Sequence, residues 1–275
     1  MPSEPTLDAQ QSKLLTAWYD IVGDRRPQES FGKLIGRTAR VQLGKPYKDA
    51  ATGPGPEVLR VTLESFDCVT FVESTLALAR CIWQGQRNTS CFLKEVTTMR
   101  YRGGKVEDFA SRLHYFSDWL LTNSDKRYVT PLTQKLGGTI IAQEFSFMSK
   151  NRRRYPALRD ETTLAKIIAG QVALGNQQHV IIERQAIRKI ESRLQDGDLV
   201  ALATHKPGLL VSHAGFVDRS VDGMPRLLHA SSHHKRVLLT KQDLADYVSR
   251  RPDRRGVILA RPLEPTTPVQ SAIRD

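Results

Sequence analysis

The sequence has few cysteines and no long apolar run. Three cysteines stand among 275 residues, and they form neither a CxxC pair nor an even set. This pattern excludes a zinc ribbon and a complete disulfide framework, so at least one thiol should be free. No apolar stretch approaches the roughly 20 residues that cross a bilayer. Residues 1–12 also lack the basic start and apolar stretch of a signal peptide.

The proportions of apolar and charged residues are not extreme either. Apolar residues make up 40% of the chain and charged residues 25%, as in globular domains, which excludes wholesale disorder, collagen and a coiled coil. Lys and Arg (41) exceed Asp and Glu (29), which gives a net charge of +12. This excess favours an acidic partner without choosing among nucleic acid, anionic lipid and an acidic cell-wall polymer.

Helical patterns come first along the chain and strand patterns last. Apolar residues at three- and four-residue spacing predict helices over 10–22, 31–42, 68–83, 109–121 and 164–171. Strand patterns occur at 57–63, 199–203, 209–217, 226–231, 237–240 and 256–261. Thr240 is expected to cap a short helix that ends near Val248. This order predicts an α+β fold with an antiparallel sheet.

The predicted domain organisation is simple. Residues 1–30 should form an N-terminal extension with a helix, and residues 31–265 a single domain. A helical insertion is expected at about 88–180, and residues 266–275 should be a tail. The basic run at 150–154 is expected in a loop of that insertion.

Cys68 is the first candidate for chemistry because it lies in the first turn of an expected helix. The positive end of the helix dipole and the unpaired backbone N–H groups there stabilise a thiolate, the form that attacks. We therefore expect a lowered pKa for Cys68 if a histidine or a cation is also near. The alternative is that Cys68 is a small buried hydrophobe.

His213 and His229 lie on two strands that flank a turn containing Asp222 and Gly223. A hairpin that pairs the two histidines directly would place both rings on one face of the sheet. The glycine that follows Ala214 leaves room for a helix to approach the strand. His213 would then take the thiol proton and His229 would fix its tautomer. Each histidine alone is equally consistent with a core or surface position.

Two other interpretations use histidines and basic runs. His213, His229, His233 and His234 could be gathered into a zinc site, but no HExxH or HxxxH pair is present. The runs at 150–154 and 250–255 could contact nucleic acid, but aromatic residues are sparse there and no binding motif occurs. We expect neither a metal nor a nucleic-acid partner. His114 is a possible alternative base.

Three short motifs carry a family resemblance. They are residues 66–73 (FDCVTFVE), 212–215 (SHAG) and 228–231 (LHAS). With these motifs the chain resembles the papain-like NlpC-type cell-wall hydrolases, and more closely the bacterial family called N-acetylmuramoyl-L-alanine amidase-like. Further matching segments extend the resemblance from about residue 30 to 261: LGKPY at 43–47, RYRGG at 100–104, RLHYFSDW at 112–119, FMS at 147–149 and GD at 197–198.

The resemblance implies a papain-like (NlpC-type) α+β fold in which the helix with the nucleophile packs on a C-terminal antiparallel sheet. It places Cys68, His213 and His229 as nucleophile, base and orienting residue. It also implies that Asp67, Tyr47 and Ser231 line the substrate pocket. Asp67 would receive a free amino group of a stem peptide and Tyr47 would donate its hydroxyl. Asp67 equally suits a helix N-cap.

The chain departs from the family pattern at two places. Val69 and Thr70 follow the cysteine where commoner members of the wider superfamily have Ser and Gly. The central stretch is also larger than a minimal member requires. Within it, Arg112 and Tyr115, with His114 between them, are expected to contact the substrate.

The expected activity is hydrolysis of an amide bond in a peptidoglycan stem peptide, through a thioester on Cys68 and without a cofactor. The enzyme would be an N-acetylmuramoyl-L-alanine amidase or a γ-D-glutamyl-diamino acid endopeptidase. Alternatives are an acyltransferase with the same triad and a non-catalytic module that binds cell wall or nucleic acid. A periplasmic or exported protein is expected if a leader was removed, and a cytoplasmic recycling enzyme otherwise.

Overall fold

The computed structural model describes residues 6–49 and 56–266. The helices are α1 (Ala9–Val22), α2 (Phe31–Arg40), α3 (Cys68–Trp83), α4 (Thr89–Arg100), η1 (Phe109–Ser111), α5 (Phe116–Asp125), α6 (Phe147–Lys150), η2 (Arg152–Arg154), η3 (Pro156–Arg159), α7 (Glu161–Gly175), η4 (Arg184–Arg193) and α8 (Leu244–Ser249). The strands are β1 (Val129–Pro131), β2 (Thr139–Ile141), β3 (His179–Glu183), β4 (Leu199–Thr204), β5 (Val211–Asp218), β6 (Arg226–Ser231), β7 (Arg236–Asp243) and β8 (Arg254–Pro262). In these ranges no helix is long and apolar enough to cross a membrane.

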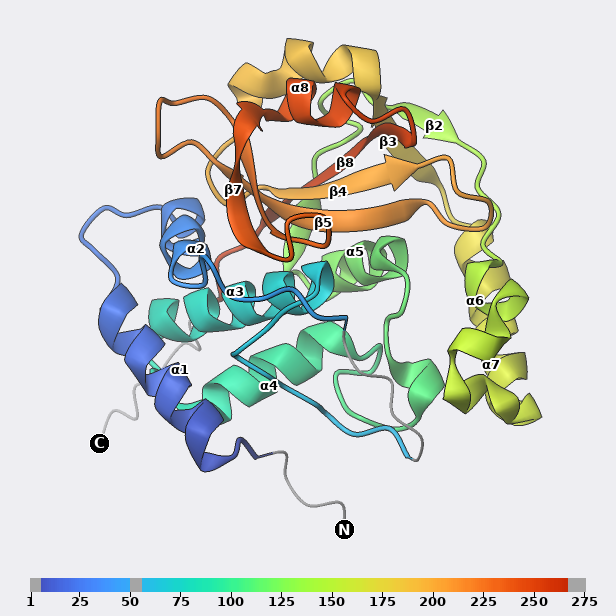
Figure 1. Ribbon diagram of the computed structural model, residues 1–275, viewed down its shortest axis with the longest axis horizontal. Coiled ribbons are helices and arrows are strands. Elements are labelled where there is room, and N and C mark those ends of the chain that lie inside the picture. Colours follow the sequence, from blue (N-terminus) through green and yellow to red (C-terminus); the bar gives the residue numbers. More distant parts are fainter. Residues whose placement is uncertain (1–5, 50–55, 267–275) are drawn as a thin grey trace, which may run out of the picture.

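An antiparallel sheet separates two groups of helices. The strand order is β2-β3-β8-β4-β5-β6-β7, and β1 also pairs with β8. Figure 1 shows α8 above the sheet, α2, α3 and α5 below it, and α4 beneath α3. Every residue of β4 is buried, because helices cover both faces of this central strand. Leu199, Ala201 and Ala203 join the core below, whereas Val200 and Leu202 join the core above.

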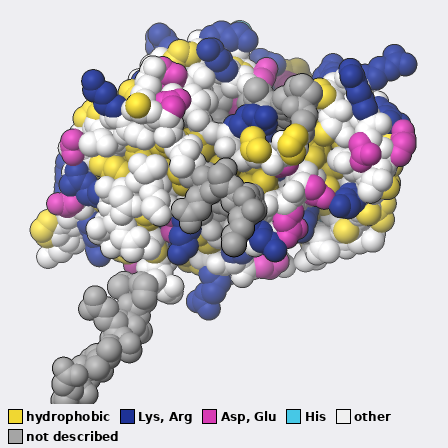
Figure 2. Space-filling model, turned by 90° about the horizontal axis from the view of Figure 1, so that it is seen from below, with side chains coloured by type: hydrophobic (Ala, Val, Ile, Leu, Met, Phe, Trp, Pro, Cys, Tyr) yellow, Lys and Arg dark blue, Asp and Glu magenta, His cyan; other side chains and the backbone are white. Residues whose placement is uncertain are grey.

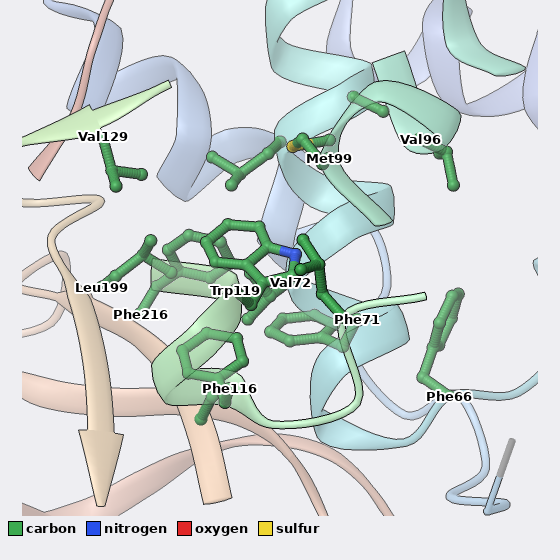
Figure 3. Packing of buried hydrophobic residues seen from close by; sticks show 14 of the residues in the cluster. Phe66, Phe71, Val72, Val96, Met99, Phe116, Trp119, Val129, Leu199 and Phe216 are labelled. Atoms are coloured by element: carbon green, nitrogen blue, oxygen red, sulfur yellow. The ribbon is translucent and has the colours of Figure 1, made fainter. Parts of the chain in front are cut away.

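Aromatic side chains dominate the core between the sheet and the lower helices. Figure 3 shows Trp119 of α5 packed among Val72 of α3 and Leu199 and Phe216 of the sheet. The rings of Phe71 and Phe216 meet edge to face with centroids 5.9 Å apart. These contacts hold the first turns of α3 against β5, and so they determine where Cys68 lies.

A buried ion pair ties together the helices below the sheet. Glu73 of α3 is 1% exposed and Arg100 of α4 is 5% exposed. Oε2 of Glu73 lies 2.8 Å from Nε of Arg100. The indole N–H of Trp119 donates to Oε1 of Glu73 at 3.2 Å. Removing one partner would leave an uncompensated buried charge, so this cluster fixes the packing of α3, α4 and α5.

A disulfide joins Cys81 of α3 to Cys91 of α4. Cys68 is the free cysteine, in accordance with the expectation of at least one free thiol. The cross-link therefore leaves the thiol at the start of α3 available for chemistry. On the face shown in Figure 2, basic and acidic side chains are intermixed, so the positive excess is not concentrated in one patch there.

The α+β expectation is confirmed, but the sheet is not built from the C-terminal region alone. Strands β1, β2 and β3 come from residues 129–183, where a helical insertion was expected. β1 and β2 have three residues each, too few to produce a readable alternation of apolar and polar side chains.

Three local predictions are wrong. The single helix expected over 109–121 is divided into η1 and α5, with residues 112–115 between them. Residues 57–63 alternate in hydrophobicity but form no strand in the structure, because they find no neighbouring strand with which to pair. Thr240 does not cap α8, since β7 continues to Asp243. The side chain of Asp243 accepts from the Asp246 N–H at 2.9 Å and is the true N-cap.

Candidate active site

Helix α3 begins at Cys68, and a capping box fixes the turn before it. Oδ1 of Asp67 accepts from the Thr70 N–H at 2.7 Å, and the Thr70 hydroxyl accepts from the Asp67 N–H at 3.0 Å. Reciprocal bonds of this kind satisfy two backbone donors that would otherwise lack partners. Asp67 is therefore an N-cap, the structural role that the sequence left open beside substrate binding.

The thiol of Cys68 lies against the start of β5. The backbone N–H groups of Ala214, Cys68 and Val69 lie close enough to the sulfur to lower its pKa. Because Ala214 directly follows His213, the sulfur lies beside the peptide bond that joins these two residues. The hydrogen bonds recorded for residues 6–49 and 56–266 include none between Cys68 and the imidazole of His213. The candidate nucleophile and base are thus neighbours that are not yet hydrogen-bonded.

The environment of Cys68 favours the neutral thiol. Burial and the adjacent Asp67 carboxylate raise the pKa of Cys68 to about 12, although the three backbone donors act in the opposite direction. The expected lowering of this pKa is wrong because desolvation and a negative neighbour outweigh the helix N-terminus. Attack by this sulfur at neutral pH therefore needs a base that removes the proton.

His213 and His229 form the tightest polar contact of the site. Nε2 of His213 lies 2.5 Å from Nδ1 of His229, and the two rings meet edge to face with centroids 4.7 Å apart. Burial, followed by the charge of Arg254, lowers the pKa of His213 to about 4. Burial, His213, Arg254 and His234 together lower the pKa of His229 well below its ordinary value. Both rings are therefore neutral at pH 7 and share one proton in this bond.

The tautomer of the pair decides what it can do. If His213 donates from Nε2 to His229, its Nδ1 keeps a free lone pair that can accept a proton. His229 then carries its own proton on Nε2, an atom that is buried and has no hydrogen-bond partner within the described residues. In the opposite tautomer His213 would be protonated on Nδ1 and could not act as a base.

The register of β5 and β6 differs by two residues from the predicted one. The recorded pairs are Phe216 with Leu228 and Asp218 with Arg226, so His229 lies opposite Gly215 and not opposite His213. A slip of two residues keeps side chains on the same face, which explains why the two rings still meet.

Gly215 is required by this arrangement. A Cβ atom added there would lie 2.8 Å from the Cβ of His229 and 2.6 Å from the carbonyl oxygen of Leu228. The glycine thus makes room for the neighbouring strand β6, and not for a helix as the sequence suggested.

Two residues to which the sequence assigned no role in this site support His229. The ring of Tyr247 packs against His229 at 5.5 Å between centroids, and Cζ of Arg254 lies 4.1 Å over the Tyr247 ring. The guanidinium also donates to the Tyr247 carbonyl oxygen. No sequence signal links α8 and β8 to the histidines, because only the folded sheet brings them together.

Tyr47 lies near the thiol. The backbone of Tyr47 forms a parallel β-bridge with Phe66. The Tyr47 hydroxyl donates to Oδ1 of Asp49 at 2.9 Å. Burial, Asp49 and the nearby Cys68 raise the pKa of Tyr47. The structure therefore brings Tyr47, Asp67 and Cys68 together, as the resemblance implied, although their contact with a substrate stays a prediction.

Arg112 lines a pocket of about 300 Å³ that also includes Thr70 of the first turns of α3. Nη1 of Arg112 lies 3.8 Å from a carboxylate oxygen of Glu57. His114, the alternative base, bonds the carbonyl oxygen of Phe109 through Nε2 at 2.7 Å. Burial lowers the pKa of His114 to about 3. The structure records no contact between His114 and Cys68 within the described ranges.

Tyr115 and Ser231 are both buried, at 6% and 2% exposure. The Tyr115 hydroxyl donates to Gln171 at 2.9 Å and accepts from the Met148 N–H at 3.0 Å. The Ser231 hydroxyl accepts from the His234 N–H at 3.1 Å in the turn after β6. Both hydroxyls are thus engaged within the protein, and their proposed substrate contacts stay predictions.

The remaining histidines of the zinc hypothesis lie in an exposed turn. His233 and His234 follow β6, and their rings are 4.9 Å apart. In the part of the chain that the structure describes, no three His, Cys, Asp or Glu side chains are grouped to hold a metal ion.

Comparison with protein families matches residues 37–257 to the model described as AmiA-like, N-acetylmuramoyl-L-alanine amidase-like. This chain belongs to the N-acetylmuramoyl-L-alanine amidase-like family. The amidase-like part of the sequence-based resemblance is thereby confirmed. No curated protein matches the sequence.

Solved structures resemble this amidase-like chain over most of its length. A structure of an N-acetylmuramoyl-L-alanine amidase from Bacteroides uniformis has 26% identity and a TM-score of 0.78, and covers 85% of this chain and 99% of that chain. A putative xylanase from Bacteroides fragilis has 29% identity and a TM-score of 0.75, over 82% and 99% of the two chains. Protein LPG0564 from Legionella pneumophila, of the DUF1460 family, shares the fold at 18% identity and a TM-score of 0.67, over 94% and 96%.

These comparisons correct the fold assignment. The papain-like, NlpC-type specification is wrong, since the family model and the similar structures belong to the amidase-like and DUF1460 fold. The specification rested on short motifs around one cysteine and two strands. Such motifs describe a local arrangement, and they do not determine how β1, β2 and β3 complete the sheet.

Proposed function

We propose that this member of the amidase-like family is a cysteine hydrolase that cleaves an amide bond of a peptidoglycan stem peptide. Cys68 is the nucleophile, His213 the general base and His229 the orienting residue. The observation that carries the proposal is the position of the Cys68 sulfur at the Ala214 N–H, directly after His213, whose ring bonds His229 at 2.5 Å. This arrangement supports the order nucleophile, base and orienting group that a cysteine hydrolase needs.

The first half of the reaction forms a thioester. His213 uses Nε2 toward His229, so Nδ1 remains to accept the proton of Cys68 as the sulfur attacks the amide carbonyl carbon. The carbonyl electrons move to oxygen, and backbone N–H groups at the start of α3 stabilise the oxyanion. When the carbonyl re-forms, the C–N bond breaks and the amine leaves with the proton from His213.

The second half returns the enzyme to its starting state. Water attacks the thioester carbonyl while His213 accepts a proton from it, and collapse of the intermediate breaks the C–S bond. The thiolate regains its proton from His213, and the product leaves as a carboxylic acid. Because His213 is neutral above about pH 4, it can accept a proton in both steps at neutral pH.

The bond between the lactyl group of the sugar and L-alanine is the favoured site of cleavage. The family is described as N-acetylmuramoyl-L-alanine amidase-like, and the Bacteroides uniformis structure is described as an N-acetylmuramoyl-L-alanine amidase. Cleavage after D-glutamate, as by an endopeptidase, is the alternative outcome of the same chemistry.

An oxidising compartment suits this protein. The Cys81–Cys91 disulfide is of a kind that persists in the periplasm or outside the cell and is rare in a reducing cytosol. We therefore propose the periplasm or the cell exterior as the place of action, where peptidoglycan is also found.

The test is digestion of purified peptidoglycan and defined muropeptides, with products identified by mass spectrometry. The wild type should release fragments whose masses show hydrolysis between the lactyl group and L-alanine, and His213→Ala should release almost none. His233→Ala is the matched control, because it removes an exposed histidine outside the site. Equal activity of the two variants, or no products from the wild type, would overturn the proposal.

A further inference from the structure

A basic pocket borders the first turns of α3, the helix that begins at the proposed nucleophile. It has a volume of about 300 Å³, and Thr70 and Ser74 of α3 form part of its lining. These two residues are one turn apart, and Thr70 is two positions after Cys68. The pocket therefore borders the same end of α3 as the sulfur, on a different face of the helix.

Cations dominate the lining of this basic pocket. Lys48, Arg60, Arg100 and Arg112 line it, whereas Asp49 is its acidic residue. Arg100 is neutralised by Glu73 at 2.8 Å. Within the lining, the other three cations outnumber the one carboxylate, Asp49.

Arg60 and Arg112 have capacity left for an anion. Arg60 is exposed, and no ion pair is recorded for its side chain within the described ranges. The contact of Arg112 with Glu57 is long, at 3.8 Å, and the same Glu57 oxygen already accepts from the Tyr101 hydroxyl at 2.8 Å. A ligand carboxylate would meet two guanidinium groups that lack a close charged partner.

Asp49 connects the basic pocket to the thiol. Its side chain lines the pocket and accepts from the Tyr47 hydroxyl at 2.9 Å, and Tyr47 is near enough to Cys68 to respond to its charge. One extended substrate can therefore place its scissile amide at Cys68 and a second group in the pocket.

We propose that the basic pocket binds a carboxylate of the substrate peptide, with Arg60 and Arg112 as its donors. This inference rests on the proposed function. It adds the requirement that the substrate carry a free carboxylate near the scissile amide, because guanidinium groups recognise carboxylates through paired, charge-assisted hydrogen bonds. A carboxamide of the same size would lose the charge and one acceptor.

The experiment uses the whole chain and two synthetic muropeptides of identical sequence. One carries free peptide carboxylates, and in the other these groups are carboxamides. The wild type should hydrolyse the carboxylate form with a kcat/KM at least about tenfold higher. In Arg60→Gln and Arg112→Gln this ratio should fall toward one, mainly through a higher KM for the carboxylate form.

Arg153→Gln is the matched control, since it removes an exposed arginine from η2 and should keep the wild-type ratio. Circular dichroism identifies any variant that fails to fold, and the exposed position of Arg60 makes its variant the decisive one. If the wild type hydrolyses both muropeptides equally, or Arg60→Gln keeps the full ratio, the pocket proposal is wrong while the hydrolase proposal stands. If Cys68→Ala is as active as the wild type on both, the proposed function itself fails.

Discussion

Replacing Gly215 with alanine should separate the two histidines of the site. The added Cβ would lie 2.6 Å from the carbonyl oxygen of Leu228 and 2.8 Å from the Cβ of His229. Carbon atoms pack at about 3.5–4.0 Å, so β6 must move away from β5 by roughly 1 Å. The obstructing atoms belong to backbone and to a Cβ, so no flexible side-chain tip can yield.

Two effects of different size should follow. Overpacking costs about 1–3 kcal/mol of stability, which leaves a chain of this size folded. A displacement of about 1 Å at a reacting group can cost on the order of a hundredfold in rate, and here it acts on a contact of 2.5 Å between His213 and His229. We therefore expect a folded protein whose kcat on a muropeptide is about a hundredfold lower.

Denaturant unfolding and steady-state hydrolysis measure the two effects separately. Gly170→Ala in α7 is the control, because an added Cβ there meets nothing within 4 Å and should stabilise the helix by about 0.5–1 kcal/mol. Wild-type stability and wild-type kcat in Gly215→Ala would refute the argument that this glycine sets the distance between the histidines.

Four further perturbations have expected outcomes. The kcat/KM of hydrolysis should fall as pH drops through about 4, where His213 becomes protonated. Arg254→Gln removes a positive charge near His213 and should move this acidic decline of kcat/KM to higher pH. A decline at the same pH in the variant would contradict an effect of the Arg254 charge on His213. Since the pKa of His213 is below its unfolded value of about 6.5, its contribution to stability is fully present above that pH and is lost as pH falls toward 4, as acid titration of unfolding would show. Glu73→Leu leaves a buried arginine unpaired and should cost about 3–5 kcal/mol in denaturant unfolding, whereas a cost below about 1 kcal/mol would mean that water reaches the site. Reduction of the Cys81–Cys91 disulfide, which closes a loop across 10 positions, should cost about 3 kcal/mol in the same assay, and an unchanged midpoint would contradict the cross-link.

The start of α3 and the strands of the site could be predicted because their signals are local. The apolar stripe after Cys68 indicates a helix, and Asp67, which directly precedes Cys68, is a residue type that caps helix N-termini. Alternating side chains place His213 and His229 on one face of a hairpin, and this conclusion survived a register error of two residues. An error of one residue would have moved one ring to the opposite face.

Features that depend on distant parts of the chain could not be predicted. Tyr247 of α8 reaches His229, and Arg254 of β8 reaches Tyr247, only because folding brings α8 and β8 close to β6. The raised pKa of Cys68 follows from burial, and a position at a helix start does not reveal burial. The strands from residues 129–183 are short and gain their stability from β8, which lies far along the chain.

The central claim is that the Cys68 thiol performs the attack. The most direct test is the kcat/KM of Cys68→Ala for hydrolysis of a defined muropeptide, measured beside the wild type at neutral pH. The account predicts a loss of at least about a thousandfold, since removal of a nucleophile leaves only binding and oxyanion stabilisation. Activity within a few fold of the wild type would contradict the assignment of Cys68 as the nucleophile.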